Sequence, residues 1–172
     1  MDKIGVIGYG VVGKAMEHTL APEFIVKKYD KYTASDSFED VCACDLIFVI
    51  VPTPFNYDSN EVDLSAVEES LVKLSEANFE GVVAIKSTVP PDTTKTLSSK
   101  YKNLELCFNP EFLRERLAKE ECASQDIVVI GTPKLEVFDL LKHMYQKVLP
   151  SHSKYFHVST TEAGVVKYCL NT

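Results

Sequence analysis

Short apolar runs alternate along the chain with segments whose apolar residues recur at helical spacing. The spacing is clearest over 64–77, where Leu64, Val67, Leu71 and Leu74 share one helix face. We predict strands over 3–7, 24–29, 45–51, 82–86, 104–108, 127–130 and 154–157, and helices over 11–20, 64–77, 114–121 and 134–147, with another starting at 90–92 and a last one from Ser159. Apolar strands that alternate with amphipathic helices predict an α/β fold. We expect a Rossmann-type, doubly wound and mainly parallel sheet with helices on both faces.

In such a sheet ligands bind at the carboxyl ends of the strands, so the loops that follow the strands are the first place to look for chemistry. The first of these loops carries Gly8-Tyr9-Gly10-Val11-Val12-Gly13, directly between a strand and a helix. Gly8 would make the tight turn, Gly10 would let a pyrophosphate approach the backbone, and Gly13 would let the helix pack closely on the strand. These six residues are candidates for cofactor binding.

Asp30 ends the second predicted strand, at the distance where a carboxylate binds the adenosine ribose hydroxyls and repels a 2′-phosphate. The pattern therefore favours NAD over NADP. Lys27, Lys28 and Lys31 surround Asp30 and leave room for the opposite preference. The structural alternative is a chance glycine triplet that precedes a surface aspartate.

Three further strand ends carry candidate residues. Val51-Pro52-Thr53-Pro54 is held extended by its prolines and Lys86-Ser87-Thr88 precedes a helix, although a rigid loop and a helix cap would explain both. Glu111 and Glu115 lie four residues apart and share a face if this turn is helical. Two neighbouring carboxylates commonly have one pKa raised towards the range of a general base. The alternative is a solvated, acidic helix start.

The last segment combines a capping-box pattern, Ser159 and Glu162, with Lys167 and Asn171 at i and i+4. It predicts a helix that projects both polar side chains from one face, which by itself is typical of an exposed surface.

Composition narrows the function classes. The 172 residues carry a net charge of -7, which disfavours binding to nucleic acid or to an anionic membrane. No signal-peptide pattern or long apolar run is present, and we expect a cytoplasmic protein. Five cysteines without framework spacing indicate reduced thiols, and Cys42-Ala-Cys44 lacks the further ligands of a zinc site, so we expect no metal.

Taken together and in this order, the motifs resemble the nucleotide-sugar 6-dehydrogenase family, the relatives of UDP-glucose and GDP-mannose dehydrogenases. Pro110-Glu111-Phe112-Leu113-Arg114-Glu115 is the most specific string. The resemblance implies that Val51, Pro52, Thr53, Ser87 and Thr88 line the cofactor site, with Thr53 and Thr88 at the nicotinamide half and Thr88 reaching the catalytic water. It further implies that Glu111 is the base in thioester hydrolysis, that Glu115 contacts cofactor and substrate, that Lys167 stabilises an oxyanion and that Asn171 helps to hold that oxygen.

The implied reaction oxidises a sugar C6 alcohol to a carboxylate, as in UDP-glucose to UDP-glucuronate for polysaccharide synthesis, with NAD as oxidant and a cysteine thioester as intermediate. We expect an NAD-binding domain over 1–157 and, over 158–172, the truncated start of the central helix of a homodimeric parent. The family's nucleophilic cysteine has no match here, and Cys169 is expected to be small, buried and turned away from Lys167. The alternatives are a non-catalytic NAD-binding module and a Rossmann dehydrogenase of the 3-hydroxyacid or 6-phosphogluconate type.

Overall fold

The apolar strands assemble into one sheet. A computed structural model describes residues 1–170, and in them seven strands form a sheet in the order β2-β1-β3-β6-β7-β8-β9. Their bounds are Lys3–Ile7 (β1), Ile25–Tyr29 (β2), Leu46–Val49 (β3), Val82–Ile85 (β6), Glu105–Phe108 (β7), Ile127–Gly131 (β8) and Lys154–Val158 (β9). Neighbouring strands are parallel except β7 and β8, which are antiparallel and meet at the pair Phe108 and Gly131. The mainly parallel sheet is confirmed.

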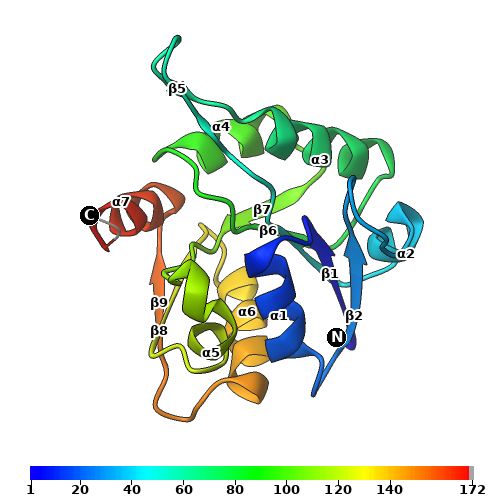
Figure 1. Ribbon diagram of the computed structural model, residues 1–172, viewed down its shortest axis with the longest axis vertical. Coiled ribbons are helices and arrows are strands. Elements are labelled where there is room, and N and C mark those ends of the chain that lie inside the picture. Colours follow the sequence, from blue (N-terminus) through cyan, green and yellow to red (C-terminus); the bar gives the residue numbers. More distant parts are fainter. Residues whose placement is uncertain (171–172) are drawn as a thin grey trace.

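Helices cover both faces of this sheet (Figure 1). One face carries α1 (Val11–Leu20), α5 (Ala118–Ala123) and α6 (Leu135–Val148), and the other carries α2 (Phe38–Cys42), α3 (Ser65–Glu76), α4 (Thr93–Lys100) and α7 (Thr160–Leu170). Side chains along each strand alternate between the two cores: Leu46 and Phe48 face the first group, and Ile47 and Val49 the second. This alternation explains why the strands are apolar throughout rather than at every second residue.

The register of the parallel strands aligns their ends. Tyr29, Ile7, Val49, Ile85 and Phe108 are the last residues of five neighbouring strands, and they pair with one another in a single row. The loops that follow these strands therefore all leave the sheet at one edge. The chain turns to α1 and β2 on one side of β1 and continues with β3 on the other, which makes β1 and β3 the switch point of the sheet.

Several local predictions need correction. The pattern missed α2 and a hairpin of β4 (Phe55–Asn56) and β5 (Glu61–Val62) that projects from the top of the molecule in Figure 1. The helix predicted from Pro90 begins only at Thr93, because Asp92 adopts a left-handed conformation with φ of 68°. The helix predicted from Arg114 is a 3₁₀ turn over Glu115–Leu117 followed by α5, since Arg114 itself is extended. The capping box of α7 is confirmed: the Glu162 N–H donates to Ser159 Oγ and the Ser159 N–H donates to Glu162 Oε2.

Within residues 1–170 no helix is long and apolar enough to cross a membrane.

Candidate active site

The glycine turn between β1 and α1 has the geometry that its sequence predicts. Gly8 has φ of +96°, and a Cβ on it would lie 2.2 Å from the carbonyl oxygen of Ile50. A Cβ on Gly13 would lie 2.2 Å from the carbonyl oxygen of Gly8, so only glycine permits this close contact between helix and turn. Among the described residues nothing lies within 4 Å of a Cβ placed on Gly10. The space beside Gly10 is thus open in front of the helix N-terminus.

That N-terminus suits an anion. Gly10 is the N-cap of α1, and no described side chain caps the helix or places an acidic group in its first turn. The unpaired N–H groups and the positive end of the helix dipole therefore face the open space beside Gly10. A pyrophosphate fits both the room and the charge.

Asp30 lies at the end of β2 and is fixed by backbone amides. Its Oδ2 accepts from the N–H of Tyr9 at 2.7 Å, and its Oδ1 accepts from the N–H groups of Tyr32 and Thr33 at 2.9 and 3.1 Å. Partial burial raises the pKa of Asp30, but the three amides outweigh that effect and hold its pKa below the ordinary value. The carboxylate is therefore charged and rigidly placed beside the glycine turn.

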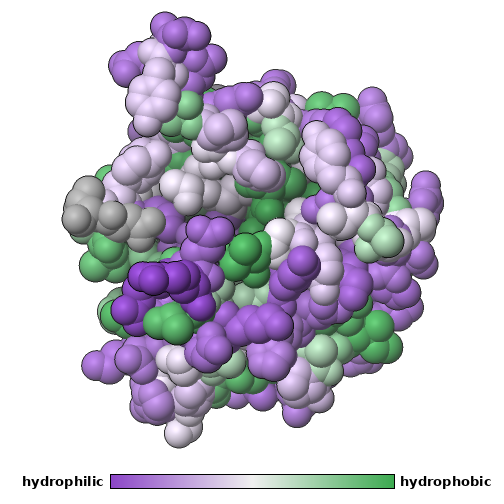
Figure 2. Space-filling model, in the orientation of Figure 1, coloured by the Kyte–Doolittle hydropathy of each residue, from purple (hydrophilic) through white to green (hydrophobic). Residues whose placement is uncertain are grey.

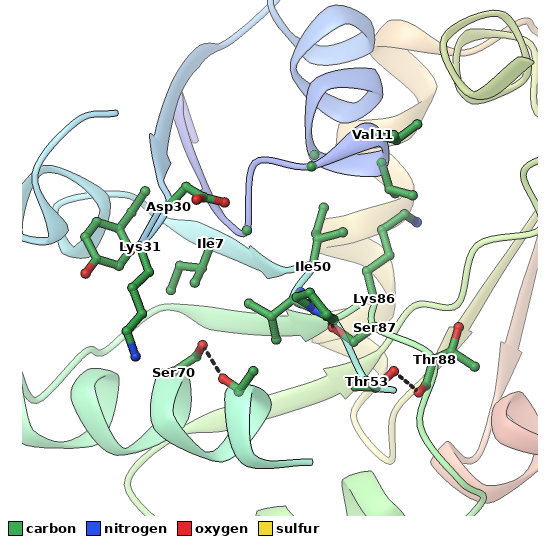
Figure 3. Close-up of a pocket in the computed structure, with 18 of the residues that line it drawn as sticks. Ile7, Val11, Asp30, Lys31, Ile50, Thr53, Ser70, Lys86, Ser87 and Thr88 are labelled. Atoms are coloured by element: carbon green, nitrogen blue, oxygen red, sulfur yellow. Dashed lines mark hydrogen bonds between the residues drawn. The ribbon is translucent and has the colours of Figure 1, made fainter. Parts of the chain in front are cut away.

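A cavity of about 550 Å³ opens at this edge of the sheet. Figure 2 shows the corresponding hollow in the middle of the face, with hydrophobic surface at its floor. Figure 3 shows Asp30 and Lys31 on one side of the cavity and Thr53 and Thr88 on the other. The cavity thus joins the loops that follow five different strands.

Most of the predicted site residues line this cavity: Gly8, Gly10, Val11, Val12, Gly13, Asp30, Val51, Pro52, Thr53, Ser87, Thr88, Glu111 and Glu115. Of the described candidates, Tyr9 and Lys167 are outside the lining. The Tyr9 ring lies instead beside the ammonium groups of Lys14 and Lys28, at 5.7 and 4.8 Å from the ring centroid, and its hydroxyl donates to Glu17. Asn171 lies outside the described residues.

Two hydroxyl side chains hold the loops after β3 and β6 together. Ser87 Oγ donates to the carbonyl of Val51 at 2.7 Å and accepts from its N–H at 2.9 Å, while Thr53 Oγ1 donates to the carbonyl of Thr88 at 2.6 Å. Ser87 and Thr53 therefore fix the wall of the cavity, whereas the Thr88 side chain is directed away from the Thr53 contact in Figure 3. The helix-cap alternative for Ser87 is not what the structure shows.

The floor of the cavity contains a buried lysine, to which the string Lys86-Ser87-Thr88 had assigned no role. Lys86 is 1% exposed, and its Nζ donates to Asn109 Oδ1 at 3.0 Å and to the Tyr145 hydroxyl oxygen at 3.3 Å. Tyr145 in turn donates to Asn109 Oδ1 at 2.6 Å, and Asn109 Nδ2 donates to the carbonyl of Val129. Burial lowers the pKa of Lys86 to about 8. The sequence does hold one sign of this buried lysine, which is an ionisable residue at the end of an apolar strand.

Glu111 meets a lysine rather than a second carboxylate. Residues 111–114 are not helical, so the condition under which Glu111 and Glu115 would share a helix face fails. Lys167 Nζ donates to Glu111 Oε1 at 2.8 Å and to the Glu111 carbonyl at 2.5 Å, and Glu111 Oε2 accepts from the N–H of Leu113. Lys167 is 1% exposed, which rules out the exposed polar face as its explanation.

Among the described residues no cysteine lines this cavity. Burial raises the pKa of the Cys42, Cys107 and Cys122 thiols above the ordinary value. It raises the pKa of the Cys44 thiol to about 11. Cys169 is exposed, and the expectation that it is buried was wrong. The buried side of α7 is taken by Ala163, Gly164 and Lys167, and Cys169 lies about 200° around the helix from Lys167.

Comparison with known proteins agrees with this geometry. Residues 14–149 match the model of the UDP-glucose/GDP-mannose dehydrogenase family, NAD binding domain. The chain belongs to this family. Its cofactor is therefore NAD, and the match decides against a dehydrogenase of the 3-hydroxyacid type.

Individual relatives point the same way. A UDP-glucose 6-dehydrogenase of Rickettsia felis is 34% identical over 131 residues, which cover 73% of this chain and 29% of that enzyme. A UDP-glucose 6-dehydrogenase of Streptococcus pneumoniae is 36% identical over 104 residues, or 59% of this chain and 26% of that enzyme. The chain thus spans about a third or less of the length of these relatives.

Solved structures share the fold. A UDP-glucose dehydrogenase from Pyrobaculum islandicum has a TM-score of 0.83 at 24% identity, covering 98% of this chain and 49% of that one. A GDP-mannose dehydrogenase from Pseudomonas aeruginosa has a TM-score of 0.81 at 21% identity, with the same coverage. Enzymes named for different sugar nucleotides therefore share this architecture.

Proposed function

We propose that the chain supplies the NAD-binding and hydride-transfer half of a nucleotide-sugar 6-dehydrogenase, with UDP-glucose as the first substrate to test. The observation that carries the proposal is the buried ion pair between Lys167 and Glu111 at the edge of the dinucleotide cavity. These residues are 56 positions apart, and their side chains are 1% and 15% exposed. A buried charged pair is expensive to maintain for stability alone, and such pairs are common at catalytic sites.

The first half of the proposed reaction converts a primary alcohol to an aldehyde. The C6 hydroxyl releases its proton to solvent and C6 loses a hydride, for which the nicotinamide ring of NAD would be the acceptor when bound. Glu111 uses two N–H donors of Lys167, so the third is available for a substrate oxygen as far as the described residues show. Positive charge at that point stabilises the negative charge that develops on the oxygen. We assign Asn171 to the same oxygen.

The second half needs a thiol. Addition of a thiolate to the aldehyde and loss of a second hydride, for which a second NAD would be the acceptor, give a thioester, which water then cleaves to the carboxylate and the free thiol. Glu111 lines the cavity and each of its oxygens keeps a second lone pair, so it serves as the base that takes the proton of water. Thr88 positions that water, and Glu115 contacts cofactor and substrate.

We assign the thiol to a segment outside these 172 residues, because none of the five cysteines lines the cavity. The same segment would bind the nucleotide of the substrate. We further propose that the whole enzyme is a cytoplasmic homodimer that serves polysaccharide synthesis.

Absorbance of NADH tests this proposal. The 172-residue chain with NAD and UDP-glucose should bind NAD and give no sustained NADH, because the sugar is not held against the nicotinamide. The product of the whole gene should give NADH and UDP-glucuronate, and Lys167→Met in that protein should abolish both. Sustained turnover by the short chain would contradict the assignment of the thiol. Binding of NAD without turnover by any form of the protein would favour a non-catalytic NAD-binding module.

A further inference from the structure

The three lysines around Asp30 are each held by a carboxylate. Lys27 Nζ lies 3.1 Å from Asp36 Oδ1, and Lys28 Nζ lies 2.5 Å from Glu17 Oε1. Lys31 Nζ lies 3.1 and 3.2 Å from the two carboxylate oxygens of Glu69 on α3. The positive charges that would suit a 2′-phosphate are thus paired with negative ones.

Of these three ion pairs, only the one made by Lys31 lines the cavity, among the residues that the structure describes. Lys31 follows Asp30 directly, and both line the cavity together with Glu69. Figure 3 shows the Lys31 side chain running from the end of β2 towards α3, the helix that carries Ser70. Lys27 and Lys28 are outside the lining, so their pairing has little bearing on the ligand.

Glu69 holds a second cavity lysine. Lys73, one turn further along α3, places Nζ 3.3 Å from Glu69 Oε1 and also lines the cavity. Hydrogen bonds and charge from Lys31 and Lys73 lower the pKa of Glu69, so this carboxylate is ionised at neutral pH. The charges of Asp30 and Glu69 therefore balance those of Lys31 and Lys73, so these four side chains give the adenosine end of the cavity no net charge.

We propose that Glu69 is a specificity-determining residue: by holding Lys31 and Lys73 it keeps both ammonium groups from a 2′-phosphate and so excludes NADP. The inference rests on the assignment of Asp30 to the adenosine ribose. Asp30 repels the 2′-phosphate directly, and Glu69 removes the two cations that would offset this repulsion. Without Glu69 the same group of residues would carry one net positive charge and would accept a phosphate.

Glu69→Gln tests this, with Glu68→Gln as the matched control. Glu68 is the preceding residue of the same helix and pairs with Lys100 at 2.5 Å, outside the cavity. Dissociation constants for NAD and NADP are measured by calorimetry for the 172-residue chain at low and at high ionic strength. We expect Glu69→Gln to lower the ratio of the NADP constant to the NAD constant about tenfold at low salt and less at high salt. Glu68→Gln should leave the ratio unchanged.

The double variant Glu69→Gln with Lys31→Met isolates the lysine. It should recover most of the discrimination that Glu69→Gln loses, because one released cation is removed. An unchanged ratio in Glu69→Gln would overturn the proposal, and so would an equal loss of affinity for both dinucleotides. A parent chain that binds neither dinucleotide would instead refute the cofactor site itself and, with it, this inference.

Discussion

Replacing Lys86 by methionine should change how the stability of the protein depends on pH. Methionine keeps the length of the side chain and removes its charge, while the hydrogen bond from Tyr145 to Asn109 Oδ1 remains. Lys86 is 1% exposed, and its Nζ contacts neutral acceptors on Asn109 and Tyr145. A buried ammonium without a carboxylate beside it destabilises the folded state when it is protonated.

The size of the effect follows from the two pKa values. The pKa of Lys86 is about 8 in the folded protein against 10.5 ordinarily. Below pH 8 both states hold the proton. Above it the folded protein releases the proton that the unfolded chain still holds, so the free energy of unfolding rises with pH. At about 1.4 kcal/mol per pH unit, this group adds roughly 2 to 3 kcal/mol of stability between about pH 7 and pH 10.

Denaturant unfolding of Lys86→Met and of the parent, followed by circular dichroism across this pH range, measures the difference. The advantage of the variant at pH 7 should shrink steadily as pH rises. The raised pKa values of the Cys44 and Cys107 thiols make both proteins lose stability above about pH 9, and this cancels in the comparison. Lys100→Met is the control, because Glu68 holds the pKa of that exposed lysine above 10.5. The difference in free energy of unfolding between Lys100→Met and the parent should therefore not change with pH over this range. A flat difference for Lys86→Met as well would refute the argument from burial.

Three further predictions concern the site. Gly10→Val should abolish NAD binding and leave the melting temperature near that of the parent, since the valine side chain would fill the open space. Gly13→Ala should lower the melting temperature, because its Cβ meets the turn backbone. An equal loss of melting temperature in both variants would show that Gly10 is structural. Asp30→Asn should reduce the preference for NAD over NADP about tenfold in a calorimetric titration, and equal or tighter NADP binding by the parent would contradict the ribose assignment. Lys167→Met should lower the free energy of unfolding by about 3 kcal/mol, because it leaves the Glu111 carboxylate largely buried without its ammonium, and adding Glu111→Gln should restore part of that loss.

Local patterns predicted most of the fold and the loops that line the cavity. The glycine turn and the strand ends depend on residues close together in sequence, and the sheet register then brings these loops to one edge. The capping box of α7 was visible for the same reason. The turn after Glu111 was not, because the Glu111 carboxylate bonds the N–H of Leu113 two residues on and so competes with helix formation.

The electrostatic partners could not be predicted in this way. Lys86 bonds residues 23 and 59 positions away, and Lys167 bonds Glu111 56 positions away. Whether such lysines are buried or exposed depends on the tertiary fold and leaves no periodic signal in the sequence. The pairing of Lys31 with Glu69, 38 positions away, was hidden for the same reason, although the sequence made Lys31 an argument for NADP.

The proposed site spans the joint between β7 and β8, the neighbouring strands of the sheet that share the fewest register pairs. In the described part of the chain these strands share a single register pair, whereas every parallel neighbour in the sheet shares four or five. The Rossmann half, with Gly10 and Asp30, lies entirely on the β7 side, while Lys167 reaches Glu111 from α7, beyond β9. Amide hydrogen exchange should accordingly give a lower free energy of opening for the amides of β8 and β9 than for those of β1 and β3. An opening at this joint would separate Lys167 from Glu111 and leave Gly10 and Asp30 in place.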